Sequence, residues 1–329
     1  MRCIAIGSHK GGTGKSTITI GIAQWFALQG ARTCVVEGDL LGAGLDLIVD
    51  ADREERIARG TDCAEDLRPS SELNHLSDFI YLPEHSSWDP EMLDSYLYPG
   101  LRLPEECGQP PNPGFDILLA WAGYGGYAPG GLPPKEGDRE RLDCDPVGRL
   151  LITSSLCRAG GNVAKCLRVL WRSLEKRGYQ YCVIDLPPGL LPPTLSILES
   201  LAGQADKVLV LTSTPSGPSI AGLVPDLDAL RRVSGVGAGN WREMVHAANK
   251  WVDPNRLEGA FPALWNRYLG DLGERGLSSL VELTRVEKLD SGVTWIAPPP
   301  WGLFSGPGSM NIERLGEKIV AGVRRPKRK

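Results

Sequence analysis

The sequence predicts an α/β fold: a doubly wound, mostly parallel β-sheet with helices on both faces. Short apolar runs recur along the 329 residues, and stretches with helical periodicity separate them. The runs are continuously apolar rather than alternating, which is typical of strands covered on both faces and therefore of parallel sheets. The predicted strands are 3–6, 33–36, 115–120, 181–184 and 208–211, with weaker patterns at 244–248 and 293–297.

Helices are predicted in the intervals between these strands. The first starts after residue 17, where the apolar residues are spaced to bury one face of a helix. We expect one domain over residues 1–325, with its ligand beyond the carboxyl ends of the strands, as in other doubly wound sheets. The later helices are predicted at about 162–177, 190–204, 218–233 and 311–323, the last packing through Ile312, Leu315, Ile319 and Val323.

The stretch from about 52 to 150 is the irregular part of the chain. It is longer and richer in proline and in glycine pairs than a minimal fold of this kind requires. Two interpretations stay open: a packed insertion with no direct role, or a surface for a dedicated partner. The prolines of this Pro/Gly-rich insertion include Pro104, Pro110, Pro111, Pro113, Pro129, Pro133 and Pro134.

A glycine-rich motif lies between the first predicted strand and the first predicted helix. It consists of Lys10, Gly11, Gly12, Thr13, Gly14, Lys15, Ser16 and Thr17. A strand, a glycine turn and a helix start form a P-loop, in which backbone N–H groups and the helix dipole surround phosphate oxygens. Lys15 would reach the β- and γ-phosphates, and the Ser16 hydroxyl would bind Mg²⁺. The motif therefore predicts a nucleoside triphosphate bound with Mg²⁺.

The residues before the first glycine separate subclasses of such loops. His9 stands where the usual pattern has glycine, and Lys10 follows it. Lys10 cannot easily turn toward phosphates that its own loop already surrounds, but it can reach a nucleotide held by a facing subunit. The alternative is a solvated loop charge. The pattern Lys-Gly-Gly-x-Gly-Lys-Ser/Thr resembles the ParA/MinD family of deviant Walker A ATPases. That resemblance implies that Lys10 is the signature lysine of a homodimer with ATP between its subunits.

Two further segments resemble the switches of that family. Switch I would run from Glu37 to Leu45, and Asp39 matches the aspartate that activates water and contacts Mg²⁺. Glu37 stands where a first aspartate is usual; either residue could instead cap the next helix. The segment that starts at Asp185 resembles switch II, with Asp185 at the Walker B position, near Mg²⁺ through water. Gly189 would supply an N–H near the γ-phosphate.

The residues that would contact the nucleotide base are the least clearly specified part of the predicted site. By resemblance, Asn249 would bond the adenine edge, and Pro299 and Pro300 match a loop that covers the purine; the alternative for this pair is a rigid turn. Asp253 lies one residue too far for the guanine motif Asn-Lys-x-Asp, which favours ATP over GTP. The resemblance covers about 1–50 and 160–325.

The resemblance implies an ATP-dependent dimerising switch: a slow Mg²⁺-dependent ATPase, stimulated by a protein partner, that positions, partitions or delivers a cargo. Three alternatives stay open. The first is an ATPase for client delivery or metallocentre maturation, the second a small-molecule kinase or synthetase, and the third a nucleotide-binding regulator with little turnover. The predicted acidic and P-loop residues disfavour the regulator.

The basic end of the chain suggests a surface that the dimer could engage. Residues 324–329 carry five positive charges in six positions. Such a tail can bind DNA phosphates or anionic lipid, or simply be a solvated end. It lacks the interleaved large apolar residues of a membrane-inserting helix, so non-specific DNA is preferred over a membrane.

Composition agrees with a cytoplasmic globular protein. The chain is 42% hydrophobic and 23% charged, with a formal net charge of −4, which gives no overall attraction to nucleic acid. No apolar stretch approaches the ~20 residues of a membrane span, and the N-terminus resembles a strand rather than a signal peptide. None of the eight cysteines forms a C-x-x-C pair, which argues against an iron–sulfur carrier, and Cys3, Cys34 and Cys182 fall in predicted buried strands. A reducing cytoplasm is expected.

Overall fold

The computed structural model describes most of the chain, apart from parts of the middle and of the C-terminal third. The described residues are 1–40, 44–63, 66–81, 90–101, 114–120, 162–214, 216–232, 241, 243–251, 266–268, 270–271, 274, 279–284 and 307–321. The predicted strand 293–297, Pro299, Pro300 and the basic tail 324–329 lie outside these residues.

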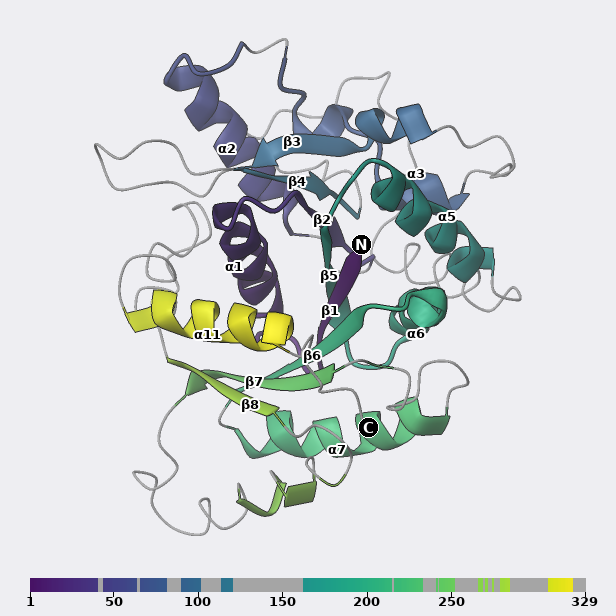
Figure 1. The fold of residues 1–329 in the computed structure, drawn as a ribbon, viewed down its shortest axis with the longest axis vertical. Helices are drawn as coiled ribbons and strands as arrows, with labels where there is room; N and C mark the ends of the chain where they lie inside the picture. The colour runs from purple at the N-terminus through teal and green to yellow at the C-terminus, as the bar shows by residue number, and fades with distance from the viewer. Residues whose placement is uncertain are drawn as a thin grey trace, which may run out of the picture.

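The strands form one eight-stranded sheet in the order β3-β4-β2-β5-β1-β6-β7-β8 (Figure 1). All neighbouring strands are parallel except β3 and β4, which pair antiparallel at one edge. The predicted doubly wound, mostly parallel α/β fold is confirmed. The strands are β1 (Arg2–Ser8), β2 (Thr33–Glu37), β3 (Leu97–Leu101), β4 (Phe115–Leu118), β5 (Tyr181–Pro188), β6 (Lys207–Ser213), β7 (Glu243–Trp251) and β8 (Ser279–Thr284).

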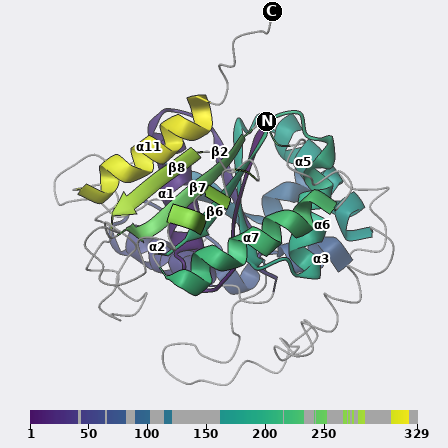
Figure 2. The same ribbon diagram turned by 90° about the horizontal axis from the view of Figure 1, so that it is seen from below.

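Helices cover both faces of the sheet, and each face has its own apolar core. One core joins α1, α2 and α11 to the sheet, and the other joins α3, α5, α6 and α7 to it. Figure 2 shows α11 and α7 on opposite sides of β7. The α-helices are α1 (Lys15–Leu28), α2 (Asp46–Ala58), α3 (Leu76–Tyr81), α5 (Asn162–Lys176), α6 (Pro192–Ser200), α7 (Gly217–Arg232) and α11 (Pro307–Ala321), and the short 3-10 helices are η1 (Ser70–Glu72), η3 (Pro90–Ser95) and η5 (Leu201–Gly203).

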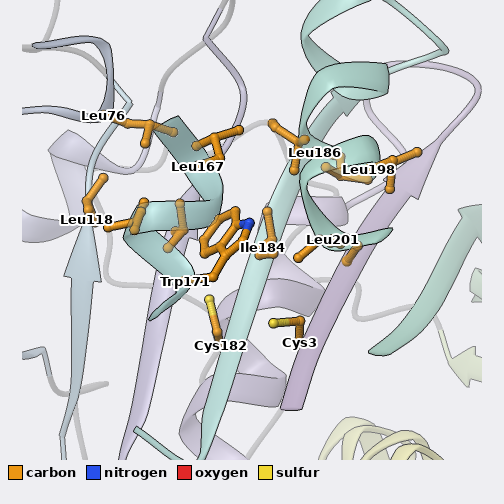
Figure 3. Close-up of a cluster of buried hydrophobic side chains, with 14 of the residues drawn as sticks. Cys3, Leu76, Leu118, Leu167, Trp171, Cys182, Ile184, Leu186, Leu198 and Leu201 are labelled. Atoms are coloured by element: carbon orange, nitrogen blue, oxygen red, sulfur yellow. The ribbon is translucent and has the colours of Figure 1, made fainter. Parts of the chain in front are cut away.

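Trp171 of α5 is central to the second core. Its ring is fully buried and lies between α5 and β5, next to Ile184 and Cys182 (Figure 3). Its indole Nε1 donates a hydrogen bond to Ser200 Oγ at 2.8 Å, so the one polar atom of the ring is satisfied. This packing fixes α5 and α6 beside β5, the strand that contains Asp185 and is followed by Gly189.

The predicted insertion contains regular structure that the sequence pattern did not reveal. Within 52–150 the chain forms the end of α2, the helices η1, α3 and η3, and strand β3, which pairs with β4. Strand β3 is thus part of the sheet, and α3 and η3 contribute to the apolar core that covers one of its faces. No helix among the described residues is long and apolar enough to span a membrane.

Candidate nucleotide-binding site

The residues of the glycine-rich motif lie where β1 gives way to α1. β1 ends at Ser8, the loop runs to Gly14, and α1 begins at Lys15. Gly14 has a φ of 82°, a left-handed conformation that favours glycine, and its carbonyl accepts the first helical bond, from Ile18 N–H at 2.9 Å. The loop therefore delivers the N-terminus of α1 to the carboxyl edge of the sheet, the geometry of an anion-binding cradle.

Asp185, Lys15 and Ser16 form the centre of the site. Lys15 is only 7% exposed, and its positive charge acts on Asp185. Ser16 Oγ donates a hydrogen bond to Asp185 Oδ2 at 2.6 Å, and Thr19 Oγ1 donates to Oδ1 at 3.3 Å. Burial raises the pKa of Asp185 to about 6, while Ser16 and Lys15 favour its ionised form. Two hydroxyls thus hold a buried carboxyl group by hydrogen bonds, and the charge of Lys15 favours its ionised form.

The segment predicted to be switch I approaches this centre from β2. Asp39 is half-buried, and its negative charge contributes to the raised pKa of Asp185. Gly38 N–H donates to the Asp185 carbonyl at 2.8 Å, which ties the end of β2 to β5. Asp39 and Asp185 are therefore close enough to act on one ligand; residues 41–43 lie outside the described part.

Glu37 is a structural brace at the start of this segment. Its carboxylate is buried and accepts hydrogen bonds from the N–H groups of Gly44 at 2.7 Å, Leu45 at 2.9 Å and Ala120 at 2.9 Å. Burial raises its pKa to about 7, and the three N–H donors oppose that rise. All of these donors come from the protein backbone, so Glu37 holds switch I against the end of β4.

The donor set at the centre fits Mg²⁺. The Ser16 hydroxyl and the carboxylates of Asp185 and Asp39 are hard oxygen donors, which this ion prefers, and it usually takes one or two carboxylates together with substrate phosphates. Among the described residues, no group of three or more His, Cys, Asp or Glu side chains is arranged to hold a metal. Ser16, Asp185 and Asp39 would hold the ion together with the nucleotide's own phosphates.

The amide of Gly189 already has an acceptor in this structure. It donates to the Ser8 carbonyl at 2.6 Å, across the junction of β5 and β1. The sequence predicts that this N–H contacts a γ-phosphate. To do so, the end of switch II would have to leave β1.

Asn249 lies against the loop. Its Nδ2 donates to the Thr13 carbonyl at 2.8 Å, and the same amide fills the space that a side chain at Gly14 would need. In this structure the side chain predicted to contact the adenine edge instead links β7 to the loop. Pro299, the other residue predicted to contact the base, is outside the described residues.

Two threonines of the site were not predicted. Thr19 lies one turn after Ser16, and this spacing on a helix face was the available signal. Thr212, at the end of β6, shares a hydrogen bond of 2.9 Å with Thr13 through their hydroxyls, and no local pattern indicates this contact between distant segments.

The outer part of the loop is open. Lys10, Gly11 and Gly12 are exposed, and Thr17 is half-buried at the start of α1. A Cβ atom on either glycine would meet nothing within 4 Å. The structure thus brings Lys15, Ser16, Asp39 and Asp185 together. Lys10 lies apart from them, at the exposed edge of the loop.

A buried histidine beside the site makes stability depend on pH. His246 Nε2 lies 2.7 Å from Ser213 Oγ, and burial lowers the pKa of His246 to about 4. Because an unfolded histidine titrates near 6.5, its contribution to stability is full above that pH and is lost as the pH falls toward 4. Between pH 7 and 5 this loss is about 2 kcal/mol. Urea unfolding at both pH values, for wild type and His246→Gln, measures it.

The difference between wild type and His246→Gln isolates this effect, because the opposing contributions of Glu37 and Asp185 are common to both proteins. The free energy of unfolding of wild type should drop by about 2 kcal/mol more than that of the variant. Equal pH dependences would show that His246 is protonated without cost in the fold.

Solved structures of known proteins share this fold. The cell division ATPase MinD of Pyrococcus furiosus superposes with a TM-score of 0.55 at 16% identity, over 97% of this chain and 98% of that one. An ATP complex of McdA from Cyanothece gives 0.55 at 13%, covering 98% and 96%. Cobyrinic acid a,c-diamide synthase of Mycobacterium smegmatis gives 0.51 at 13%, covering 99% and 96%. At these identities the likeness concerns the fold.

The family comparison covers nearly the whole chain. No curated protein sequence matches it significantly. A family model does match residues 4–321, from β1 to the end of α11, and so spans the loop, both switches and Asn249. The chain belongs to the CobQ/CobB/MinD/ParA nucleotide-binding domain family.

Proposed function

We propose that this protein is a Mg²⁺-dependent ATPase that dimerises around ATP and acts as a molecular switch for positioning, partitioning or delivering a cargo. The observation that carries the proposal is the cluster of Lys15, Ser16 and Asp185, with Asp39 beside it, under a loop whose Lys10 is exposed. The cluster would supply what phosphoryl transfer to water requires, and the exposed lysine would act outside its own subunit.

Each residue has a separate role in this proposal. Lys15 would bind the β- and γ-phosphates, and Ser16 and Asp185 would hold the metal. Bound Mg²⁺ would neutralise charge on the phosphates. Asp39 would orient the attacking water from the switch I side. ATP is proposed as the nucleotide because the guanine motif is absent after Asn249. A MinD structure from Pyrococcus horikoshii with the same fold contains Mg-ADP, which supports this choice of ligand.

Two hydrogen bonds suggest how the switch would operate. Gly189 N–H is bonded to Ser8, and Asn249 Nδ2 is bonded to Thr13. Each donor would exchange its present acceptor for the nucleotide, so that switch II and β7 respond when the γ-phosphate is present and return after hydrolysis. The reordered surface would then bind a protein partner that stimulates turnover or is itself the cargo.

Dimerisation tests the proposal directly. Wild type and Asp39→Ala are compared by size-exclusion chromatography with light scattering, with Mg-ATP or Mg-ADP. Asp39→Ala should bind ATP without hydrolysing it, and it should elute as a dimer with Mg-ATP but not with Mg-ADP. Wild type should be a dimer only transiently. Phosphate release measures turnover in parallel. If both proteins stay monomeric at micromolar concentration, the dimer proposal is wrong.

The same variant addresses the alternatives. A client or a metal that co-purifies with Asp39→Ala would favour a delivery or metallocentre ATPase. ADP formation that depends on an added small molecule would favour a kinase or synthetase. ATP binding without phosphate release, even with the captured partner, would favour a regulator. We expect the partner to be a cytoplasmic protein.

A basic stripe on α5 supports DNA as the surface that the dimer engages. Lys165, Arg168, Arg172 and Lys176 are spaced to lie on one side of the helix, and the buried Leu167, Leu170 and Leu174 lie on the opposite side. Nearby Glu175 bonds the N-terminal ammonium group at 2.8 Å. Such a row of cations can contact successive phosphates without reading sequence.

Replacing Lys165 and Arg172 by glutamine should weaken binding to a random DNA duplex. It should also reduce the slope of log K against log salt by about 2, because each lost phosphate contact removes about 0.9. Fluorescence anisotropy at several salt concentrations measures both. Arg314→Gln with Lys318→Gln, two exposed cations on α11, is the control of equal charge. Unchanged binding contradicts the DNA proposal, and retention on anionic vesicles instead would favour a membrane surface.

A further inference from the structure

The segment that precedes the exposed lysine is anchored to α7 by a histidine. His9 Nδ1 lies 3.0 Å from Asp226 Oδ2, with the His9 side chain 34% exposed and that of Asp226 18% exposed. An ionised carboxylate can only accept, so Nδ1–H is the donor, which fixes the orientation of the ring. This contact joins the loop to a helix more than 200 residues further along the chain.

α7 is shaped to receive this ring. Gly222 lies four residues before Asp226, on the same side of the helix. A Cβ atom at Gly222 would overlap the imidazole at three ring atoms, Cδ2, Cγ and Nε2. The missing side chain at Gly222 and the carboxylate of Asp226 thus form one recess, and His9 occupies it.

The neighbouring residues of His9 are held as well. Ser8 Oγ donates to the Lys10 carbonyl at 2.6 Å, and Gly189 N–H donates to the Ser8 carbonyl at 2.6 Å. On the other side, Gly11 is exposed and a Cβ there would meet nothing within 4 Å. The backbone of Lys10 is therefore fixed from the His9 side, by bonds that reach switch II and α7.

We infer that His9 is the positioning residue for Lys10, and that Gly222 and Asp226 of α7 transmit the position of this helix to it. The inference rests on the proposed cross-subunit role of Lys10. A long side chain that must reach a second subunit depends on the position of the backbone that carries it, since a displacement of a catalytic group by about 1 Å can reduce turnover about 100-fold. Movement of α7 would then advance or withdraw Lys10 while the phosphate-binding residues stay in place.

Three single variants disturb this anchor from three positions: His9→Ala, Asp226→Ala and Gly222→Ala. Each should leave ATP affinity within about twofold of wild type, because Lys15 and Ser16 are untouched, and should lower kcat at least about tenfold. His9→Asn keeps a donor near the position of Nδ1 and should recover part of the loss. Gly203→Ala, where a Cβ meets nothing within 4 Å, is the matched glycine control.

A double-mutant cycle separates positioning from a general loss of stability. If His9 acts through Lys10, the double variant His9→Ala, Lys10→Ala should be no slower than Lys10→Ala alone. Effects that multiply would overturn the inference, as would a Gly222→Ala protein with wild-type turnover. Should Gly222→Ala fail to fold, Asp226→Ala provides the same comparison.

Hydrogen exchange gives a readout that does not depend on ATP hydrolysis. In the protein without nucleotide, the peptide covering residues 8–12 should exchange faster in all three anchor variants, and at the wild-type rate in Gly203→Ala. Unchanged exchange would overturn the inference even in an active enzyme. Faster exchange together with a wild type that hydrolyses no ATP would uphold the anchor and contradict the proposed ATPase function instead.

Discussion

Replacing Lys15 by alanine should abolish nucleotide binding, with affinity for Mg-ATP reduced about 100-fold or more. Lys15, the first residue of α1, is 7% exposed, and its charge favours the ionised carboxylate of Asp185. Two charge-assisted hydrogen bonds to phosphates contribute about 1.5–3 kcal/mol each, and each 1.4 kcal/mol is a factor of ten in affinity. No other cation among the motif residues could replace it, because Lys10 is exposed.

Titration calorimetry with the non-hydrolysable ATP analogue AMPPNP measures this loss, and Lys318→Ala, an exposed lysine on α11, is the control. The variant should still fold. Asp185 keeps its bonds from Ser16 and Thr19, and with a pKa of about 6 it can take up a proton when the lysine is absent. A Lys15→Ala protein that folds and binds AMPPNP with wild-type affinity would contradict the assignment of the loop as the phosphate site.

Local sequence was sufficient for the centre of the sheet and for the loop. The runs before residues 9, 37 and 185 are continuously apolar because β1, β2 and β5 are covered on both faces, so pattern and burial agree. β3 was missed because Pro99 and Gly100 interrupt it, which an edge strand tolerates. β8 was missed because it is short and has a glutamate at its fourth position.

Contacts between distant segments could not be predicted from sequence. Nothing near Gly222 indicates that an imidazole from residue 9 fills the space beside it, since that depends on how α7 packs against the loop. The resemblance predicts that Asn249 contacts adenine. Its bond to the Thr13 carbonyl depends on how close the fold brings β7 to the loop, which the local sequence does not indicate. Residue types thus indicated the chemistry, while the fold determined which groups meet.

Replacing Lys10 by alanine should leave ATP affinity within about twofold but lower turnover about 100-fold or more, as expected when a cation that stabilises transition-state charge is removed. Lys10 is exposed at the rim of the loop, whereas Lys15, the residue proposed to bind the phosphates, is buried. Phosphate release and ATP binding, measured on the same preparation, separate the two effects. Wild-type turnover by this variant would count against any catalytic role for Lys10.

Mixing two inactive variants decides whether Lys10 acts within its own subunit or on its neighbour. In a mixed dimer of Lys10→Ala and Asp39→Ala, the site with an intact Asp39 would be completed by the Lys10 of the other subunit. Since about half of the dimers are mixed and each then has one complete site of two, a 1:1 mixture should recover about a quarter of wild-type turnover. A lysine that serves its own site cannot rescue, because every site then lacks one of the two groups. Recovered activity therefore requires the shared, two-subunit site.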